Sequence, residues 1–371
     1  MKIISWNARG LGSPSAFRFL KLLVKEQRPD LLFLIKTKLT CNSVDRFCSC
    51  LKFSNGLEVP RLGMKGGLLL LWLANIDVTL NSYSMNHFDV LVSSDNCHQF
   101  HFTGFYGAPE THLRINTWNL LSSLVSNASN LPWLVLGDFN ELLSNEDKVG
   151  GPPRDDMLMD NFRGAINRCH LRVVYFNGDP FTWTNKNHHG NVVRERLDRG
   201  FIYNNWSDFF NKATLSHLDF YHSDHRAIEY IVSQPNLPVL SSQRRIRFRF
   251  EQMWLKDTDC RDIVQAFWCT NSSRQPTASV LQNIAACTAA LQDWHGKKYG
   301  QMGKDIAAAH KTSSHLNNIN DNSTAHLKWV EDADKVLDEL LEKEELYWHQ
   351  RARVDWLQSG DSNTKFFSFQ S

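Results

Sequence analysis

Several features that would place a protein in a membrane or an oxidising compartment are missing from this sequence. No apolar run reaches the ~20 residues that a bilayer crossing requires, and the longest, Gly67 to Ala74, has only the length of a strand. The start, Met1 to Asn7, lacks the long apolar core of a secretory signal. The eight cysteines form no CxxC pair and no Cys/His spacing of a zinc site. These absences predict a soluble intracellular protein with free thiols and no membrane partner.

The chain also lacks a strong charge of either sign. With 41 Lys and Arg residues against 39 Asp and Glu residues, the net charge is +2, so binding to a polyanion would need a local basic patch. A hydrophobic content of 42% and an aromatic content of 12% exclude a disordered chain. The length of 371 residues indicates two or three domains, or one large domain with an appendage.

Residues 1–232 alternate short β-like runs with turns and a few helical stretches. This pattern favours an α+β sandwich over a doubly wound parallel sheet. The predicted helices are Ala16–Gln27, His112–Val125 and Met157–Cys169. The predicted strands are Lys2–Trp6, Leu31–Ile35, Gly67–Leu73, Asp77–Tyr83, His98–Tyr106, Trp133–Leu136 and Arg226–Val232.

The remainder of the chain has a different sequence pattern. Residues 233–250 form a predicted linker whose basic cluster, Arg244, Arg245 and Arg247, either binds phosphates beside interleaved phenylalanines or simply lies against the sandwich. Residues 251–371 carry apolar side chains at helical spacing in two stretches. Because the Ser- and Asn-rich Thr312–Thr324 separates these stretches, an antiparallel helical hairpin with a loop there is predicted.

Polar clusters stand where strands of the first region should end. Asp138 and Asn140 occupy alternate positions after a buried strand, so their side chains should point the same way. A carboxylate beside an amide can hold a water molecule or hydroxyl and accept its proton. Asp224 and His225 precede another apolar strand and could supply a hard-metal ligand and a phosphate-binding imidazole. Each cluster alone is more often structural, but their occurrence in this order favours one shared site.

The ordered set resembles the exonuclease–endonuclease–phosphatase superfamily, and more closely the endonuclease domain of plant LINE-type (non-LTR) retrotransposons. The motifs that carry the resemblance are Ser5-Trp-Asn-Ala-Arg-Gly-Leu-Gly12, Arg28-Pro-Asp-Leu-Leu-Phe-Leu34, Gly66-Gly-Leu-Leu-Leu-Leu-Trp72, Gly104-Phe-Tyr-Gly107, Gly137-Asp-Phe-Asn140, Phe181-Thr-Trp-Thr-Asn185, Arg196-Leu-Asp198 and Ser223-Asp-His-Arg226. The resemblance covers residues 1–232 and implies a four-layer α/β/β/α sandwich of the deoxyribonuclease-I-like kind. Residues 351–367 resemble the segment that precedes the reverse transcriptase in such elements, so residues 251–371 would be that segment, with the polymerase itself absent.

The resemblance also implies a reaction, the hydrolysis of a DNA phosphodiester that leaves a 3′-hydroxyl. Asp138 and Asn140 would orient and activate the attacking water. His225 would stabilise the charge that develops on the phosphate, with Asp198 orienting its imidazole. Tyr106 would contact the phosphate or the leaving group. Such roles are physically sensible, because donors in a dry cleft stabilise the anionic transition state.

The implied cofactor is Mg²⁺, or Mn²⁺ in its place, with Asn7 and Asp224 beside the ion. One position departs from the family, in which the strand at Leu31–Ile35 runs into Glu-Thr-Lys and the Glu is the main metal ligand; this chain has Lys36-Thr-Lys38. Two unit charges at about 4 Å interact by about 4 kcal/mol at an effective dielectric near 20. We therefore expect Lys36 to impair metal binding and activity.

The surface that meets DNA is predicted from Arg9 and Thr182, together with the linker arginines. The family would place the protein in the nucleus. Two alternatives stay open at this point. The chain could be an inactive pseudoenzyme or remnant that at most binds nucleic acid, or a phosphodiesterase of the same superfamily that acts on RNA or phospholipid. Lys36 separates an active nuclease from an inactive one.

Overall fold

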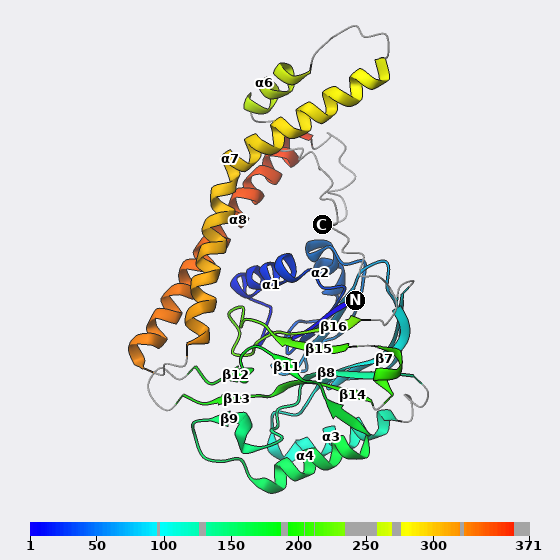
Figure 1. Cartoon of the computed structure of the whole chain (residues 1–371). Coiled ribbons are helices and arrows are strands. Elements are labelled where there is room, and N and C mark those ends of the chain that lie inside the picture. Colours follow the sequence, from blue (N-terminus) through cyan, green and yellow to red (C-terminus); the bar gives the residue numbers. More distant parts are fainter. Residues whose placement is uncertain are drawn as a thin grey trace, which may run out of the picture. The chain divides into compact units, whose positions relative to one another are not determined.

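The structure is a computed structural model that describes residues 1–94, 97–125, 131–186, 192–203, 205–210, 212–233, 258–268, 276–319 and 323–359 (Figure 1). The chain divides into two compact units. Unit 1 comprises residues 1–237 and 314–331, and unit 2 comprises residues 238–313 and 332–371. The basic cluster Arg244, Arg245 and Arg247 lies outside the described residues. Within the described part of the chain, no helix has both the length and the apolar character needed to span a membrane.

Two large sheets form the body of unit 1. The seven-stranded sheet has the order β11 (Phe176–Asn177), β15 (Lys212–His217), β16 (Ile228–Ser233), β1 (Lys2–Asn7), β2 (Leu31–Ile35), β4 (Leu68–Trp72), β3 (Asn55–Val59). The six-stranded sheet has the order β10 (Leu171–Val173), β14 (Asp198–Tyr203), β8 (Trp133–Asp138), β7 (Cys97–Tyr106), β6 (His87–Ser94), β5 (Asp77–Ser84). A small third sheet joins β12 (Trp183–Thr184), β13 (Arg194–Glu195) and β9 (Lys148–Val149).

Helices cover the outer face of each large sheet. Helices α1 (Pro14–Gln27) and α2 (Val44–Leu51) lie on the seven-stranded sheet, and α3 (Arg114–Leu124) and α4 (Asp156–Arg168) lie on the six-stranded sheet (Figure 1). Helix α1 begins after Ser13, whose Oγ accepts the Ala16 N–H, with a proline at the first helical position. Single turns occupy Thr111–Leu113, Asn145–Asp147 and α5 (Trp206–Phe209). The predicted four-layer α+β sandwich is confirmed.

The apolar core lies on both faces of the central strands. Phe33 of β2 and Leu134 and Leu136 of β8 pack between the two sheets. Successive side chains alternate across a strand, so Leu32 and Leu34, which are also fully buried, face the helices instead. Burial on both sides explains why these strands read as continuous apolar runs rather than as alternating patterns.

The predicted elements of unit 1 are found within a few residues of their predicted bounds. Helix α2, strands β3, β6, β14 and β15, and the strands of two or three residues, β9 to β13, were not predicted. The predicted loop at Thr312–Thr324 is wrong in extent, because α7 (Pro276–Asn318) continues through its first half. The hydroxyls that suggested a loop have partners in the helical structure: Thr312 Oγ1 donates to the Ala308 carbonyl of the same helix, and Ser313 Oγ donates to Asp334 of α8 (Thr324–Ser359).

Unit 2 contains α6 (Thr258–Phe267), most of α7 and most of α8 (Thr324–Ser359). Cys260 of α6 and Leu291 of α7 form a small core to which Tyr347 of α8 adds its ring. Further along α7, Ser313 contacts Asp334, which lies earlier in α8. Because contacts advance along α7 while they move back along α8, the two helices are antiparallel, and the predicted helical hairpin is confirmed.

We predict that Gly137→Ala destabilises unit 1 by about 2–3 kcal/mol or more. Gly137 lies in β8 directly before Asp138, and a Cβ built there would lie 1.8 Å from the Phe105 carbonyl oxygen of β7. The measurement is urea-induced unfolding followed by tryptophan fluorescence. Gly12→Ala is the matched control, because a Cβ at Gly12 meets nothing within 4 Å. Equal stabilities of the two variants would contradict this packing.

Candidate active site

The register of the six-stranded sheet brings three functional side chains to one place. Asp138 is the last residue of β8, and its neighbours directly across the ladder are Tyr106 on β7 and Asp198 on β14. Residues opposite each other in a sheet share one face. The strand register alone therefore sets a phenol and two carboxylates side by side.

The seven-stranded sheet contributes the facing group. Asn7 ends β1 opposite Ile35 of β2, so Lys36 follows directly at the same rim. Asp224 and His225 precede β16, which pairs with β1. The Asn7 amide joins the two sheets, because its Nδ2 donates to Asp138 Oδ2 at 2.8 Å.

Several of these residues line a pocket of about 430 Å³, called the inter-sheet pocket below, whereas Asp138 and Asp198 are buried beside it and do not line it. The predicted site residues that line it are Asn7, Arg9, Lys36, Tyr106, Asn140, Asp224 and His225. Three of them, Arg9, Lys36 and Asn140, hold left-handed backbone conformations with φ of 54°, 55° and 53°. Such conformations are costly for residues with a Cβ and concentrate at functional sites.

Asn140 reaches the pocket differently from the prediction. Strand β8 ends at Asp138, so strand alternation does not orient Asn140. Asp138 Oδ1 instead accepts the Asn140 N–H at 2.9 Å and folds the chain into a turn. The Asn140 amide Nδ2 then donates to the Gly107 carbonyl at 2.8 Å and lies 3.2 Å from Asp138 Oδ2. The predicted pairing of Asp138 and Asn140 is present, but a turn produces it.

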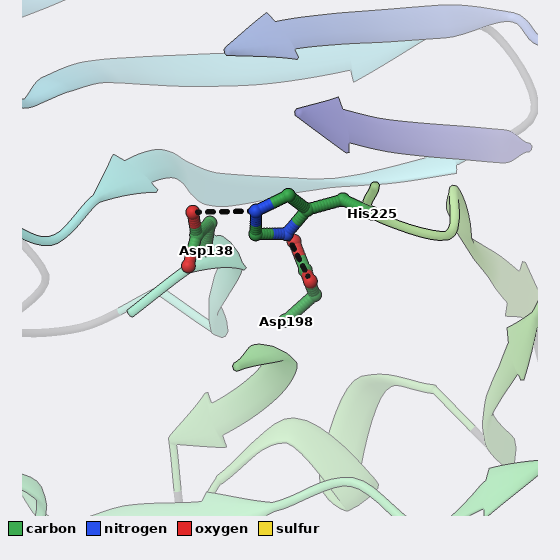
Figure 2. A group of neighbouring side chains, drawn as sticks. All are labelled: Asp138, Asp198 and His225. Carbon is green, nitrogen blue, oxygen red and sulfur yellow. Dashed lines mark hydrogen bonds and ion pairs between the residues drawn. The ribbon is translucent and has the colours of Figure 1, made fainter. Parts of the chain in front are cut away.

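The imidazole of His225 lies between two buried carboxylates, as Figure 2 shows. Its Nδ1 donates to Asp198 Oδ2 at 2.9 Å, and its Nε2 lies 3.8 Å from Asp138 Oδ2. Burial alone lowers the pKa of His225, but the Asp198 and Asp138 carboxylates outweigh burial and raise it to about 9. Burial raises the pKa of Asp198 to about 6, against the opposing effect of His225. At neutral pH the pair is therefore an imidazolium beside a carboxylate.

Asp138, Asp198 and His225 are close enough to hold a metal ion, since one ligand atom from each lies within 4.8 Å of the others. Their hydrogen bonds favour a different use of the group. His225 Nδ1 is engaged by Asp198. His225 Nε2 lies 3.3 Å from the Asn7 amide Nδ2 and 3.8 Å from Asp138, so a metal ion bound here would have to displace these contacts and the ring proton. Without a metal, the group is suited to hold a proton against a substrate anion.

The residues at the predicted Mg²⁺ position do not suit the ion, because cations lie among them and their side-chain oxygens already accept hydrogen bonds. Arg9 Nη1 forms an ion pair with Asp224 Oδ2, and Trp183 Nε1 donates to the same oxygen at 2.9 Å. The backbone N–H of Arg9 donates to Asn7 Oδ1 at 3.1 Å. The ammonium of Lys36 lines the same pocket. Mg²⁺ prefers anionic oxygen ligands, so these residues as they stand do not fit it.

The charge of Lys36 is perturbed by this setting. Burial lowers the pKa of Lys36, and the Arg9 guanidinium lowers it further, while the Asp224 and Asp138 carboxylates oppose both effects. Burial, with the Asp138 carboxylate next in importance, raises the pKa of Tyr106, which therefore stays a neutral phenol and can donate a hydrogen bond.

The prediction that Thr182 contacts DNA is wrong. Its side chain is fully buried, and its Oγ1 accepts the backbone N–H groups of Leu197 and Asp198 at 3.0 and 2.9 Å. Thr182 thus fixes the start of β14, from which Asp198 reaches His225. Arg9 lies at the pocket, and its contact with DNA stays a prediction.

The sequence did not predict the network of ion pairs at the inter-sheet pocket. Arg154 spans two carboxylates, Glu141 at 3.1 Å and Glu195 at 2.8 Å. Arg114 pairs with Glu141 at 2.6 Å, and Lys148 pairs with Glu195 at 2.5 Å. These residues are scattered in sequence and form no motif. Trp183 could have been found, because it lies within the Phe181–Asn185 motif.

Comparison with known proteins gives the following similarities. No family model matches the chain, and no curated protein matches it. The endonuclease domain of a telomere-specific non-LTR retrotransposon is 13% identical over 63% of this chain and 99% of its own, with a TM-score of 0.47. A 3′-5′ exonuclease from Neisseria meningitidis is 14% identical over 63% and 100% of the two chains, with a TM-score of 0.48. An AP endonuclease from Leishmania major is 15% identical over 63% and 88%, also with a TM-score of 0.48.

We predict that the His225 imidazole titrates at about pH 9 and that Asp198→Asn lowers this midpoint by about 1 unit or more. Burial lowers the pKa of His225, and without the Asp198 carboxylate fewer negative charges oppose that lowering. In the folded protein the pKa of His225 lies above its ordinary value of 6.5. The protonated imidazole therefore contributes its full stabilisation below pH 6.5, and this stabilisation is lost as the pH rises through about 9. NMR titration of the ring nitrogens measures the midpoint. An unchanged midpoint in a folded Asp198→Asn variant would contradict the assigned pairing.

Proposed function

We propose that unit 1 is an endonuclease-like domain of retrotransposon origin that binds the DNA backbone in the inter-sheet pocket, and that Lys36 impairs its Mg²⁺-dependent phosphodiester hydrolysis. The observation that carries this proposal is that Asn140 and His225, which adjoin strands of two different sheets, line one pocket and both contact the buried Asp138. A structural role for each residue alone would not require that they converge.

The chemistry of the group suits a phosphodiester. The nonbridging oxygens gain negative charge as the phosphorus is attacked, and the His225 imidazolium and the Tyr106 phenol can donate to them. Asp138 accepts hydrogen bonds from the side-chain amides of Asn7 and Asn140, which hold its carboxylate in place to orient a water molecule and accept its proton.

The retrotransposon assignment is supported by the order of the motifs along residues 1–232 and by the tail at residues 351–367. The finer assignment, to LINE-type elements of plants and hence to the nucleus, has the same support. The ancestral substrate would be DNA, and the ancestral partner a reverse transcriptase domain.

A second candidate function is nucleic-acid binding without catalysis. The placement of Lys36 and Arg9 favours it, because both cations line the pocket together with Asn7 and Asp224, the residues that the resemblance assigns to the divalent ion. The two candidates differ in one measurable property, the turnover of DNA in the presence of a divalent ion.

We predict that Lys36→Glu raises the rate of supercoiled plasmid nicking in Mg²⁺ by about a hundredfold or more. This increase in rate is expected because two unit charges about 4 Å apart interact by about 4 kcal/mol, and each 1.4 kcal/mol corresponds to about a tenfold change in metal affinity. The assay compares wild type and Lys36→Glu in Mg²⁺, in Mn²⁺ and in EDTA. Lys38→Glu is the matched control, because it makes the same charge change two residues away with the same left-handed backbone.

The double variant Lys36→Glu with His225→Ala should lose the gained activity, which separates this site from a contaminating nuclease. Strong and equal nicking by wild type and Lys36→Glu would contradict impairment by Lys36. Nicking by neither protein, with DNA binding retained, would favour the non-catalytic candidate. Parallel assays on RNA and on a phospholipid test the remaining substrates of the superfamily.

A further inference from the structure

Among the residues that the structure describes, one cation lining the inter-sheet pocket forms no ion pair with a carboxylate. Arg114, Lys148 and Arg154 are each paired with a glutamate, and Arg9 is paired with Asp224. The remaining cation, the Lys36 ammonium, makes no hydrogen bond or ion pair with any described residue.

The backbone on both sides of Lys36 is fixed. The Ala8 N–H donates to the Ile35 carbonyl at 3.0 Å, and the Thr37 N–H donates to the Gly67 carbonyl at 2.9 Å. Between them Lys36 holds its left-handed conformation, with φ of 55°. The chain thus maintains a strained residue at the rim of the pocket, so the lysine stem starts from a set position and direction.

An unpaired ammonium in a half-buried position is costly unless an anion approaches it. Arg9 lines the same pocket and is near enough to lower the pKa of Lys36; its side chain is 55% exposed, and its Nη1 is directed to Asp224. An arginine carries five N–H donors in a fixed fork, so further donors of Arg9 remain for a ligand. A phosphodiester is a monoanion with two nonbridging oxygens, which two adjacent cations can bind together.

We propose that Lys36 and Arg9 bind one DNA phosphodiester directly, so that the inter-sheet pocket takes DNA without a divalent cation. This inference rests on the proposed function and names how the same site recognises its ligand. The two side chains supply the positive charge at the phosphate, while Asn7 and Asp224 hold Arg9 in place.

The test is fluorescence anisotropy of a labelled DNA duplex with the full chain, at matched ionic strength in EDTA and in Mg²⁺. Wild type should bind equally well in both. Lys36→Gln should weaken binding about tenfold, the loss typical of one hydrogen bond to a charged group, and Lys36→Arg should retain most of the affinity. Lys38→Gln is the matched control, since it removes the same charge from a residue that does not line the pocket.

Arg9→Gln is a second variant in case Lys36→Gln does not fold, since the Arg9 side chain is largely exposed. It should also weaken binding in EDTA, and circular dichroism checks the folding of each variant. Binding that appears only with Mg²⁺ would overturn the inference and leave the proposed function standing. No binding in either buffer would overturn the proposed function itself. Equal losses in Lys36→Gln and Lys38→Gln would show a diffuse surface attraction and overturn the inference.

Discussion

The hydrogen bond between His225 and Asp198 is the contact on which the candidate site depends. Asp198 begins β14 of the six-stranded sheet, and His225 precedes β16 of the seven-stranded sheet. Between the sheets the core is apolar, so polar groups can meet only at its rim, where each buried one needs a partner. The pair satisfies that need, and together with the Asn7 to Asp138 contact it joins two separately formed sheets into one site.

Much of the fold was predictable because burial leaves a strong pattern. Leu31–Ile35 is apolar at every position since both of its faces are covered, and it was predicted with its observed bounds. Strand β14 was not predicted because it contains Arg199, a buried cation. That charge is tolerated through an ion pair with Asp147, which lies 52 residues earlier in the chain. A partner so distant leaves no local signal.

The candidate site, like the fold, could be predicted only in part from the sequence. The order of the motifs predicted which residues would meet, and Asn140 and His225 both contact Asp138. Their detailed positions depend on backbone geometry that spacing does not encode. Asn140 is placed by a left-handed turn, and the Thr182 hydroxyl is occupied by two backbone N–H groups. The pairing of Arg9 with Asp224 joins residues 215 apart, so sequence alone could not show that the carboxylate is already engaged.

In the seven-stranded sheet β1 pairs with β16, the strand that comes last in the sequence, and this pairing has a consequence for protein synthesis. β1 lies between β2 and β16, with Ile4 opposite Glu229, so its second neighbour leaves the ribosome more than two hundred residues later. Translation proceeds from the N-terminus, and until β16 emerges one edge of β1 stays exposed on the nascent polypeptide. His225 arrives with that same strand. A ribosome that stops short of it releases a product with an open edge prone to self-association and with no imidazole to complete the pocket.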